Sequence, residues 1–349
     1  MAKIGFLKIK AYLKLFYKVF LYFYSFLTNI KALDLQNNNK YTIAFYNLEN
    51  LFDTIDDPDT DDDDFTPEGV KKWTPRRYKK KIKRLARAIS TIGDDDMQEP
   101  PALLGIAEVE TFEVVTDLIQ NKYLADFHYG IVHYDSPDER GIEVAFLYRK
   151  EYFELLDSKP YGITFKKDDG AIDYTRDVLH VKGKLNGELM HILVNHWPSR
   201  RSGIEVSEYK RIAVAELNQK IMQDILKKEK EAKFLIMGDF NDNPTNRSIK
   251  NTLVTENFYN PMESLYDKGH GSANFQGEWY LFDQIIFSKN FFYENKHQFK
   301  HAEIYCKHFL KDKYGKFVED PFRTYRGNWY KGGISDHFPV YISLELKAD

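Results

Sequence analysis

The sequence predicts one large α/β domain. Short apolar runs of strand-forming residues alternate with segments of helical periodicity along the body of the chain. No internal repeat and no low-complexity linker interrupts this alternation. The chain has 349 residues, of which 43% are hydrophobic, and this suffices for a single sizeable core. We therefore expect one domain over residues 37–349, preceded by a separate segment over residues 1–36.

The first 36 residues differ in composition from the rest. They hold six lysines and one acidic residue, and an apolar run covers residues 19–27. A basic stretch before a short apolar stretch is the layout of a secretory signal, and this run is too short to span a bilayer as a helix. We expect export to the periplasm or the medium of a bacterium. The alternatives are a cytoplasmic protein with an amphipathic surface helix, or membrane attachment through this segment if it stays uncleaved.

Strands and helices follow in order along the body. Residues 41–46 form a β-rich apolar run, and an acidic loop over residues 56–64 comes next. Residues 76–92 place Ile82, Leu85 and Ile89 on one helical face, and a second amphipathic helix fits residues 205–229. Further strands are predicted over residues 102–109, 142–148, 179–185, 190–195, 234–237, 283–287 and 340–344.

Polar side chains stand beside six of these strands. One such residue alone is more often a helix cap or a satisfied turn residue. Six occurrences favour a functional site at one edge of the sheets. Oxygen ligands without a cysteine cluster suit Mg²⁺ or Ca²⁺ rather than Zn²⁺, and histidines near carboxylates suit acid–base chemistry. The residues concerned are Asn47, Glu49, Glu108, Glu110, His196, Asp239, Asn241, Asp283, Asp336 and His337.

The charge balance excludes one class of function. The chain carries 50 basic and 53 acidic residues, and the body is more acidic still because the N-terminal segment is basic. Proteins that coat nucleic acid depend on lysine and arginine for phosphate affinity, so this body does not fit that class. A metal enzyme that concentrates carboxylates around a cation remains compatible. The single cysteine, Cys306, allows neither an intrachain disulfide nor a cysteine-rich metal site.

In order and residue type, these segments resemble the endonuclease/exonuclease/phosphatase superfamily, which includes deoxyribonuclease I. The most specific pieces are Gly238-Asp239-Phe240-Asn241 and Ser335-Asp336-His337, and the resemblance covers residues 41–345. The runs over residues 45–53 and 196–200 are typical of its bacterial, often exported branch. The resemblance implies a four-layer α/β/β/α sandwich of two mixed β-sheets flanked by helices, and a metal-dependent phosphoesterase activity.

The resemblance also implies a metal site. Glu108 would be the main ligand, with Asn47 in support, Glu49 as a second acidic ligand and Asp336 completing the shell. The implied cation is Mg²⁺, with Mn²⁺ or Ca²⁺ as alternatives. Hydroxide attack on an anionic phosphodiester is slow until a cation and hydrogen-bond donors neutralise the non-bridging oxygens.

The remaining matches imply catalytic roles. His196 would contact the scissile phosphate and protonate the leaving oxygen, and Asn241 would donate to a non-bridging oxygen. Asp239 would polarise water or metal. Asp283 would orient His337, the general base, and fix its tautomer. The residues expected at the substrate phosphate are Asn47, His196, Asn241 and Arg200.

Four other features have two interpretations each. Asp57, Asp59, Asp61, Asp63 and Glu68 have the spacing of a calcium loop, but Asp62 occupies the position that needs glycine, so we expect a solvated acidic loop. Glu143 would pair with His196 or form a surface ion pair. The arginines at 176, 201 and 323 would surround the phosphate or be solvated. The aromatic pair at 329–330 would stack a base or pack its loop.

The expected function is that of an endonuclease or phosphodiesterase that uses metal- and histidine-assisted attack of water. The alternatives are a phosphatase or sphingomyelinase-like hydrolase of the same superfamily, and a catalytically inactive binding module. Intact Glu108, Asp239 and His337 argue against the inactive module. We expect a monomer with a phosphate-ester substrate, DNA or RNA among the candidates, and no stable protein partner.

Overall fold

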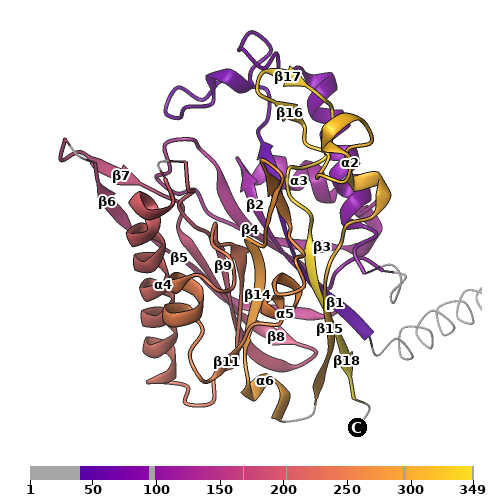
Figure 1. Cartoon of the computed structure of the whole chain (residues 1–349). Coiled ribbons are helices and arrows are strands. Elements are labelled where there is room, and N and C mark those ends of the chain that lie inside the picture. The colour runs from indigo at the N-terminus through magenta and orange to yellow at the C-terminus, as the bar shows by residue number, and fades with distance from the viewer. Residues whose placement is uncertain (1–39, 94–98, 168, 202, 294–295, 348–349) are drawn as a thin grey trace, which may run out of the picture.

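A computed structural model of the chain describes residues 40–93, 99–167, 169–201, 203–293 and 296–347. The N-terminal segment with its expected export signal lies outside the described residues. Two six-stranded sheets occupy the centre of the molecule (Figure 1), in the orders β15-β18-β1-β2-β4-β3 and β11-β14-β10-β9-β8-β5. Both sheets are mixed, because β1 and β10 each have one parallel and one antiparallel neighbour.

The first sheet consists of β1 (Lys40–Leu51), β2 (Leu103–Val109), β3 (Tyr129–His133), β4 (Glu143–Arg149), β15 (His297–Ile304) and β18 (Val340–Leu346). The second consists of β5 (Phe153–Tyr161), β8 (Val178–Leu185), β9 (Glu188–His196), β10 (Phe234–Asp239), β11 (Phe258–Tyr259) and β14 (Asp283–Ser288). Three hairpins stand apart from the sheets: β6 (Thr164–Lys166) with β7 (Ile172–Tyr174), β12 (Ala273–Phe275) with β13 (Glu278–Tyr280), and β16 (Tyr325–Arg326) with β17 (Trp329–Tyr330).

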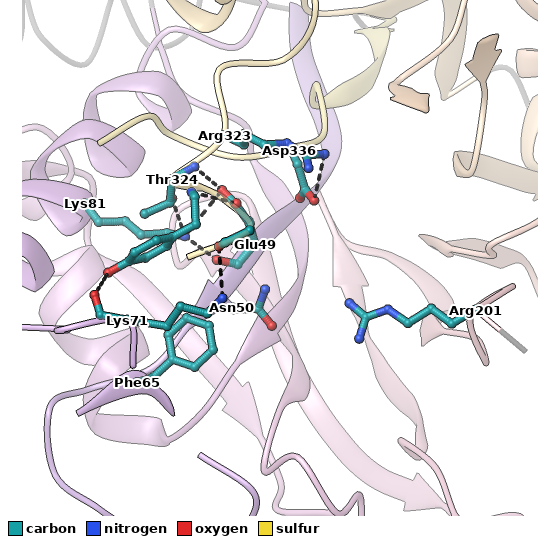
Figure 2. A pocket seen from close by; sticks show the side chains of 11 residues that line it. Glu49, Asn50, Phe65, Lys71, Lys81, Arg201, Arg323, Thr324 and Asp336 are labelled. Atoms are coloured by element: carbon teal, nitrogen blue, oxygen red, sulfur yellow. Dashed lines mark hydrogen bonds and ion pairs between the residues drawn. The ribbon is translucent and has the colours of Figure 1, made fainter. Parts of the chain in front are cut away.

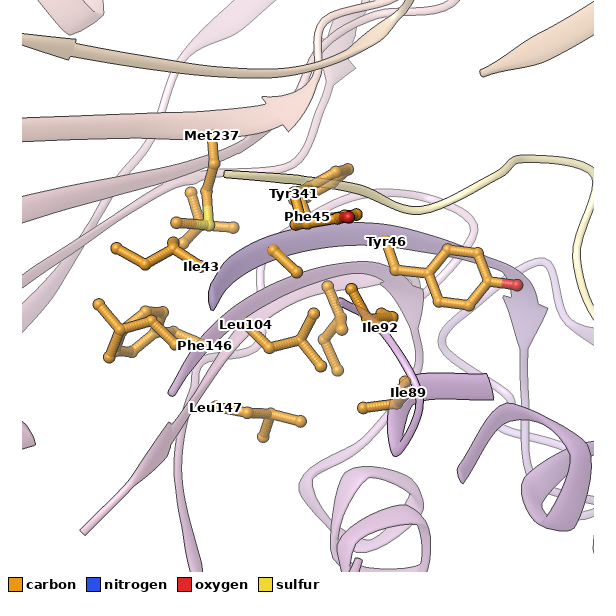
Figure 3. Close-up of a cluster of buried hydrophobic side chains, with 14 of the residues drawn as sticks. Ile43, Phe45, Tyr46, Ile89, Ile92, Leu104, Phe146, Leu147, Met237 and Tyr341 are labelled. Atoms are coloured by element: carbon orange, nitrogen blue, oxygen red, sulfur yellow. The ribbon is translucent and has the colours of Figure 1, made fainter. Parts of the chain in front are cut away.

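The two sheets pack face to face over one core (Figure 3). Side chains alternate across a strand, so Ile43 and Phe45 share one face of β1. That face meets Met237 of the second sheet. Gly105 of β2 permits this approach, because a Cβ at that position would lie 2.5 Å from the sulfur of Met237. The distance between the sheets therefore depends on a glycine opposite a large side chain.

Helices cover the outer faces. The helix α2 (Pro75–Ile89) begins with proline at its first position, which its fixed φ favours, and buries Leu85 and Ile89 against the first sheet. The helix α3 (Phe112–Ile119) packs beside it. The helix α4 (Ile204–Leu226) packs Val214 and Met222 against the second sheet. Two short helices, α5 (Met262–Tyr266) and α6 (Asn290–Tyr293), also lie within the described residues.

These layers form the expected α/β/β/α sandwich. The predicted strands correspond to β1, β2, β4, β8, β9, β10, β14 and β18, and the two predicted helices to α2 and α4. The missed strands of the two large sheets are the four edge strands, β3, β5, β11 and β15. Polar residues interrupt the apolar pattern in β5 and β15, and β11 has only two residues. Within the part of the chain that the structure describes, no helix is both long and apolar enough to cross a membrane.

Candidate active site

The expected site residues meet at one edge of the two sheets. In the second sheet, Asp239 pairs in register with His196 on one side and with Asp283 on the other. In the first sheet, Asn47 of β1 lies beside the end of β2, where Glu108 stands. The strand β18 runs antiparallel to β1, so the residues just before Val340 return to the same edge. Strand register alone thus gathers residues that lie up to 290 positions apart.

Four residues at this edge have left-handed backbone conformations. The φ angles are 53° at Glu49, 49° at Asn50, 60° at Glu108 and 49° at Asn241. The register of β1 with β2 shifts between Asn47 and Leu51, and that of β2 with β4 shifts at Glu108. Such bulges redirect side chains next to active sites, and each strained residue costs about 1–3 kcal/mol. The fold therefore stabilises unfavourable backbone geometry where the polar side chains converge.

Buried Asp283 and partly buried His337 form a dyad. His337 Nδ1 lies 2.6 Å from Asp283 Oδ2, and Ser272 Oγ lies 2.5 Å from the same oxygen. The other ring nitrogen of His337, Nε2, lies 3.9 Å from Asp239 Oδ2. Burial alone lowers the pKa of His337, but Asp283 and Asp239 outweigh it and hold the pKa well above 6.5. The dyad therefore fixes the ring and directs Nε2 toward Asp239.

His196 stands on the opposite side of Asp239. Its Nε2 lies 3.8 Å from Asp239 Oδ2 and 3.8 Å from Glu108 Oε1. Burial, with help from Arg176 and Arg140, lowers the pKa of His196 well below 6.5. Its Nδ1 is buried and has no hydrogen-bond partner among the described residues. The two histidines are therefore opposite in charge preference: burial and the two arginines favour the neutral form of His196, whereas the carboxylates favour the protonated form of His337.

The anticipated pairing of His196 with Glu143 is absent from the described contacts. Glu143 is buried and hydrogen-bonded to Ser136, and burial raises its pKa to about 7. Glu143 sits at the start of β4, opposite Val109, and so beyond the bulge that turns Glu108 toward the histidine. The nearest carboxylates to the His196 ring are thus those of Glu108 and Asp239.

Asp239 is the centre of the polar network. Its Oδ2 accepts a hydrogen bond from Asn47 Nδ2 at 3.0 Å, and its Oδ1 accepts one from the Asn241 amide at 2.9 Å. Burial raises the pKa of Asp239 to about 6; Asp283 adds to this effect and His337 opposes it. Asn241 also donates through Nδ2 to the Trp197 carbonyl at 3.0 Å.

Three of the four expected metal ligands keep oxygen atoms that could accept a further contact. Glu108 accepts from the Asn50 amide through Oε2 at 2.7 Å, and its side chain is partly exposed. Asn47 uses Oδ1 for the Glu49 amide, and this oxygen retains a second lone pair. Asp336 lies 3.5 Å from Arg323. A donor set of carboxylate and amide oxygens beside crowded carboxylates fits a hard divalent cation such as Mg²⁺.

Glu49 differs from the other three. Its carboxylate accepts from the backbone amides of Thr324 at 2.6 Å and Tyr325 at 3.3 Å. Buried Lys81 donates to its carbonyl and lies 3.9 Å from its carboxylate (Figure 2). Burial, together with the charge of Asp336, raises the pKa of Glu49. In this structure Glu49 therefore anchors the 324–325 segment and has little capacity left for a cation.

The arginines near the site differ in what their side chains contact. Arg200 donates to the Asn241 carbonyl at 2.6 Å and pairs with Asp242, so its guanidinium holds the loop after β10 rather than facing a phosphate. Arg176 pairs with Asp138 at 3.0 Å and donates to the Trp197 carbonyl. By contrast, Arg201 is exposed.

The acidic loop does not assemble a cation site. Asp62 is buried and accepts from the Asp57 amide, which folds the loop on itself. Among the described residues, the only group of three acidic or histidine side chains close enough to share an ion is Asp239, Asp283 and His337. The two aromatic residues at 329 and 330 have different surroundings. Tyr330 packs on Arg77, whereas Trp329 is 71% exposed.

The sequence analysis gave no role to three residues that support the site. Ser272 donates to Asp283, and Lys81 contacts Glu49. Ser335 donates to the Asn47 carbonyl at 2.6 Å and accepts from the His337 amide at 3.1 Å. Only Ser335 had a usable signal, its place immediately before Asp336. The other two lie in segments whose patterns predict nothing beyond a loop or a helix.

Comparisons with known proteins identify a family and several solved structures with a similar fold. Residues 42–346 match the Endonuclease/Exonuclease/phosphatase family. A humanised D. rerio TDP2 has a similar structure, with a TM-score of 0.54 and 14% identity over 88% of this chain and 99% of that one. So has an endonuclease/exonuclease/phosphatase family protein from Bacteroides thetaiotaomicron, with a TM-score of 0.54 and 18% identity over 89% and 99%.

A mannosyl-6-phosphatase from Bacteroides thetaiotaomicron is also similar, with a TM-score of 0.53 and 17% identity over 87% of this chain and 99% of that one. At these identities the likeness establishes a shared fold. No curated protein matches the sequence significantly. The family match extends over almost all of the described residues and includes every residue of the candidate active site. The chain belongs to the endonuclease/exonuclease/phosphatase family.

Proposed function

We propose that the chain hydrolyses phosphate esters, with a phosphodiester, including that of a nucleic acid, as the first candidate substrate. The observation that carries this proposal is the arrangement of two histidines of opposite charge preference on either side of Asp239. Family membership and the structural likeness to a TDP2 and to a phosphatase support the same reaction class.

In the proposed mechanism His337 is the general base. Asp283 holds Nδ1–H, so Nε2 is the nitrogen that accepts a proton from the attacking water. Asp283 then stabilises the imidazolium that forms. Because the base works in its neutral form, the rate should fall as the pH drops through the raised pKa of His337.

The phosphate in this proposal lies between the two histidines. Neutral His196 donates a hydrogen bond to a phosphate oxygen, and Asn241 supplies a second donor when Nδ2 turns from the Trp197 carbonyl. Neutral donors suit this position because they offer hydrogen bonds to the phosphate and add no negative charge to that of the nearby carboxylates. Asn47 holds Asp239 in place from the first sheet.

The metal dependence is part of the proposal. A divalent cation held by Glu108, Asn47 and Asp336 would neutralise charge on the phosphate. Glu49 and Arg200 are removed from the direct contacts in this account. Glu49 instead positions the segment that leads to Asp336, and Arg200 positions the loop that contains Asn241.

A second candidate function is phosphatase activity on a compact phosphomonoester. A cavity of about 190 Å³ beside Asp336 favours it, because so small a space accepts a compact polar group rather than a duplex. Likeness to a mannosyl-6-phosphatase is compatible with this candidate.

The test is a substrate panel with the purified full chain. Plasmid DNA, RNA, bis-p-nitrophenyl phosphate, p-nitrophenyl phosphate, sphingomyelin and inositol phosphates would each be assayed with Mg²⁺. At least one should be hydrolysed, and His337→Ala should lower that rate on the order of 10²–10⁴-fold. His308→Ala, a change at an exposed histidine, is the matched control. No hydrolysis of any substrate, or equal rates in both variants, would contradict the proposal.

A further inference from the structure

A cavity adjoins the candidate active site on the side of Asp336 (Figure 2). The end of β1, the segment that leads to α2 and the β16–β17 hairpin contribute its walls, and its volume is about 190 Å³. Asp336 lines this cavity and also belongs to the proposed metal site. Asp336 therefore places the cavity next to the proposed metal site.

The cavity is cationic in a protein whose net charge is −3. Four basic side chains line it and only two carboxylates do so. Lys81 lies 3.9 Å from Glu49, which compensates one cation. Arg323 lies 3.5 Å from Asp336, which compensates another. Two of the four positive charges are thus paired within the cavity wall.

The other two cations have no acidic partner among the described residues. Lys71 Nζ donates only to neutral acceptors, the Gly327 carbonyl at 3.0 Å and Asn328 Oδ1 at 2.9 Å. Arg201 points toward the cavity from the opposite side (Figure 2). Two uncompensated cations that face each other across a small cavity form a site for an anion.

We propose that this cavity binds a second phosphate group of the substrate, next to the ester phosphate that is hydrolysed. This inference rests on the proposed function of the neighbouring site. Phe65 and Tyr325 line the same cavity and provide aromatic surface for the carbon skeleton that joins the two phosphates. The second phosphate has two chemical sources: the next phosphate of a nucleic-acid strand, or another phosphate on a small polyol.

The experiment measures kcat/KM for matched pairs of substrates that differ by one phosphate. One arm compares inositol bisphosphates with inositol monophosphates. The other compares thymidine dinucleotides with and without a terminal phosphate. In at least one arm the additional phosphate should raise kcat/KM about tenfold or more, the usual strength of a hydrogen bond to a charged group. The arm with the larger ratio identifies the source.

Substitutions of the cavity residues test whether they cause the preference for the additional phosphate. Lys71→Met and Arg201→Met should each reduce the ratio severalfold, whereas Lys71→Arg should retain it because the charge remains. The control is Lys72→Met, a neighbouring exposed lysine that does not line the cavity and should keep the full ratio. Raising the ionic strength should reduce the ratio in the unmodified chain, since the Arg201 charge is exposed.

Direct binding keeps the inference separate from catalysis. Calorimetry with the full chain should show that an inositol bisphosphate binds about tenfold tighter than a monophosphate, and that Lys71→Met removes this difference. If the chain hydrolyses nothing but binds in this way, the proposed function fails and the anion site stands. If esters are hydrolysed but the additional phosphate changes neither kcat/KM nor affinity, or Lys71→Met leaves the preference intact, the second-phosphate site is refuted.

Discussion

Replacing Asp283 with asparagine removes the charge that holds His337. Asp283 is fully buried, and its Oδ2 faces His337 Nδ1 at 2.6 Å and Ser272 Oγ at 2.5 Å. A hydrogen bond to a charged group contributes about 1.5–3 kcal/mol and a neutral one about 0.5–1.5 kcal/mol. The loss of roughly 1–2 kcal/mol should lower the pKa of His337 by about one pH unit, at ~1.36 kcal/mol per unit.

Two kinetic consequences follow for the Asp283→Asn variant. The rate on the best substrate of the panel should fall on the order of 10²–10⁴-fold, because the tautomer and orientation of the base are no longer fixed. The acidic limb of the kcat/KM profile, which the raised pKa of His337 places above pH 6.5, should move to lower pH.

The assay is a kcat/KM profile from pH 5 to 9 for the unmodified chain and two variants. Ser272→Ala is the control, since it removes the other donor to the same oxygen and keeps the carboxylate charge. We expect it to change the rate less than the Asp283→Asn substitution and to leave the limb above pH 6.5. An Asp283→Asn protein that is folded, retains the parental rate and shows the same limb would refute the role of the dyad.

Three further predictions concern the metal, a buried ion pair and pH stability. Chelation with EDTA should abolish activity and Mg²⁺ should restore it; activity in chelator would contradict this. Glu108→Gln should lower activity by at least about 10–100-fold while the melting temperature changes little, because the loss of a ligand costs no less than the loss of a residue that supports one. Asp242→Ala should lower the free energy of unfolding by about 3–5 kcal/mol in a urea titration, because Arg200 and buried Arg211 lose their partner. Asp224→Ala, at a surface ion pair, should change this free energy by less than about 0.5 kcal/mol. Burial and a neighbouring histidine lower the pKa of His180 to about 4. Between about pH 6.5 and 4 the unfolded state therefore binds more protons, and the free energy of unfolding should fall by up to roughly 3 kcal/mol as the pH falls through this window. His180→Leu should make the free energy of unfolding less dependent on pH in this window.

The sequence predicts the site because the site depends on strand ends. Apolar periodicity locates β1, β2, β9, β10 and β14, and the polar residue that follows or opens each strand then falls at one edge. Asp239 and Asp283 illustrate this, since they become register partners although 44 residues separate them. Edge strands such as β15 escape prediction because one face is solvated and their apolar pattern is broken.

What the sequence could not predict is the direction of the side chains. The left-handed conformations at Glu49 and Glu108 lie two residues or fewer from strand positions of ordinary geometry, and no residue type marks them. They turn Glu108 toward His196, and Glu49 toward the 324–325 segment. The contacts of Arg200 could not be predicted for a related reason: its partners lie in the loop after β10, some 40 residues away, and no local pattern indicates them.

The central claim is that a phosphate binds between His196 and His337 at the edge of the two sheets. A crystal structure of the full chain with Mg²⁺ and inorganic phosphate measures this directly. We expect the phosphate within hydrogen-bond distance of a ring nitrogen of His196 and of His337 Nε2, with the cation on Glu108. A phosphate bound elsewhere on the molecule at full occupancy, with this edge empty and both histidines in contact only with protein, would contradict the account.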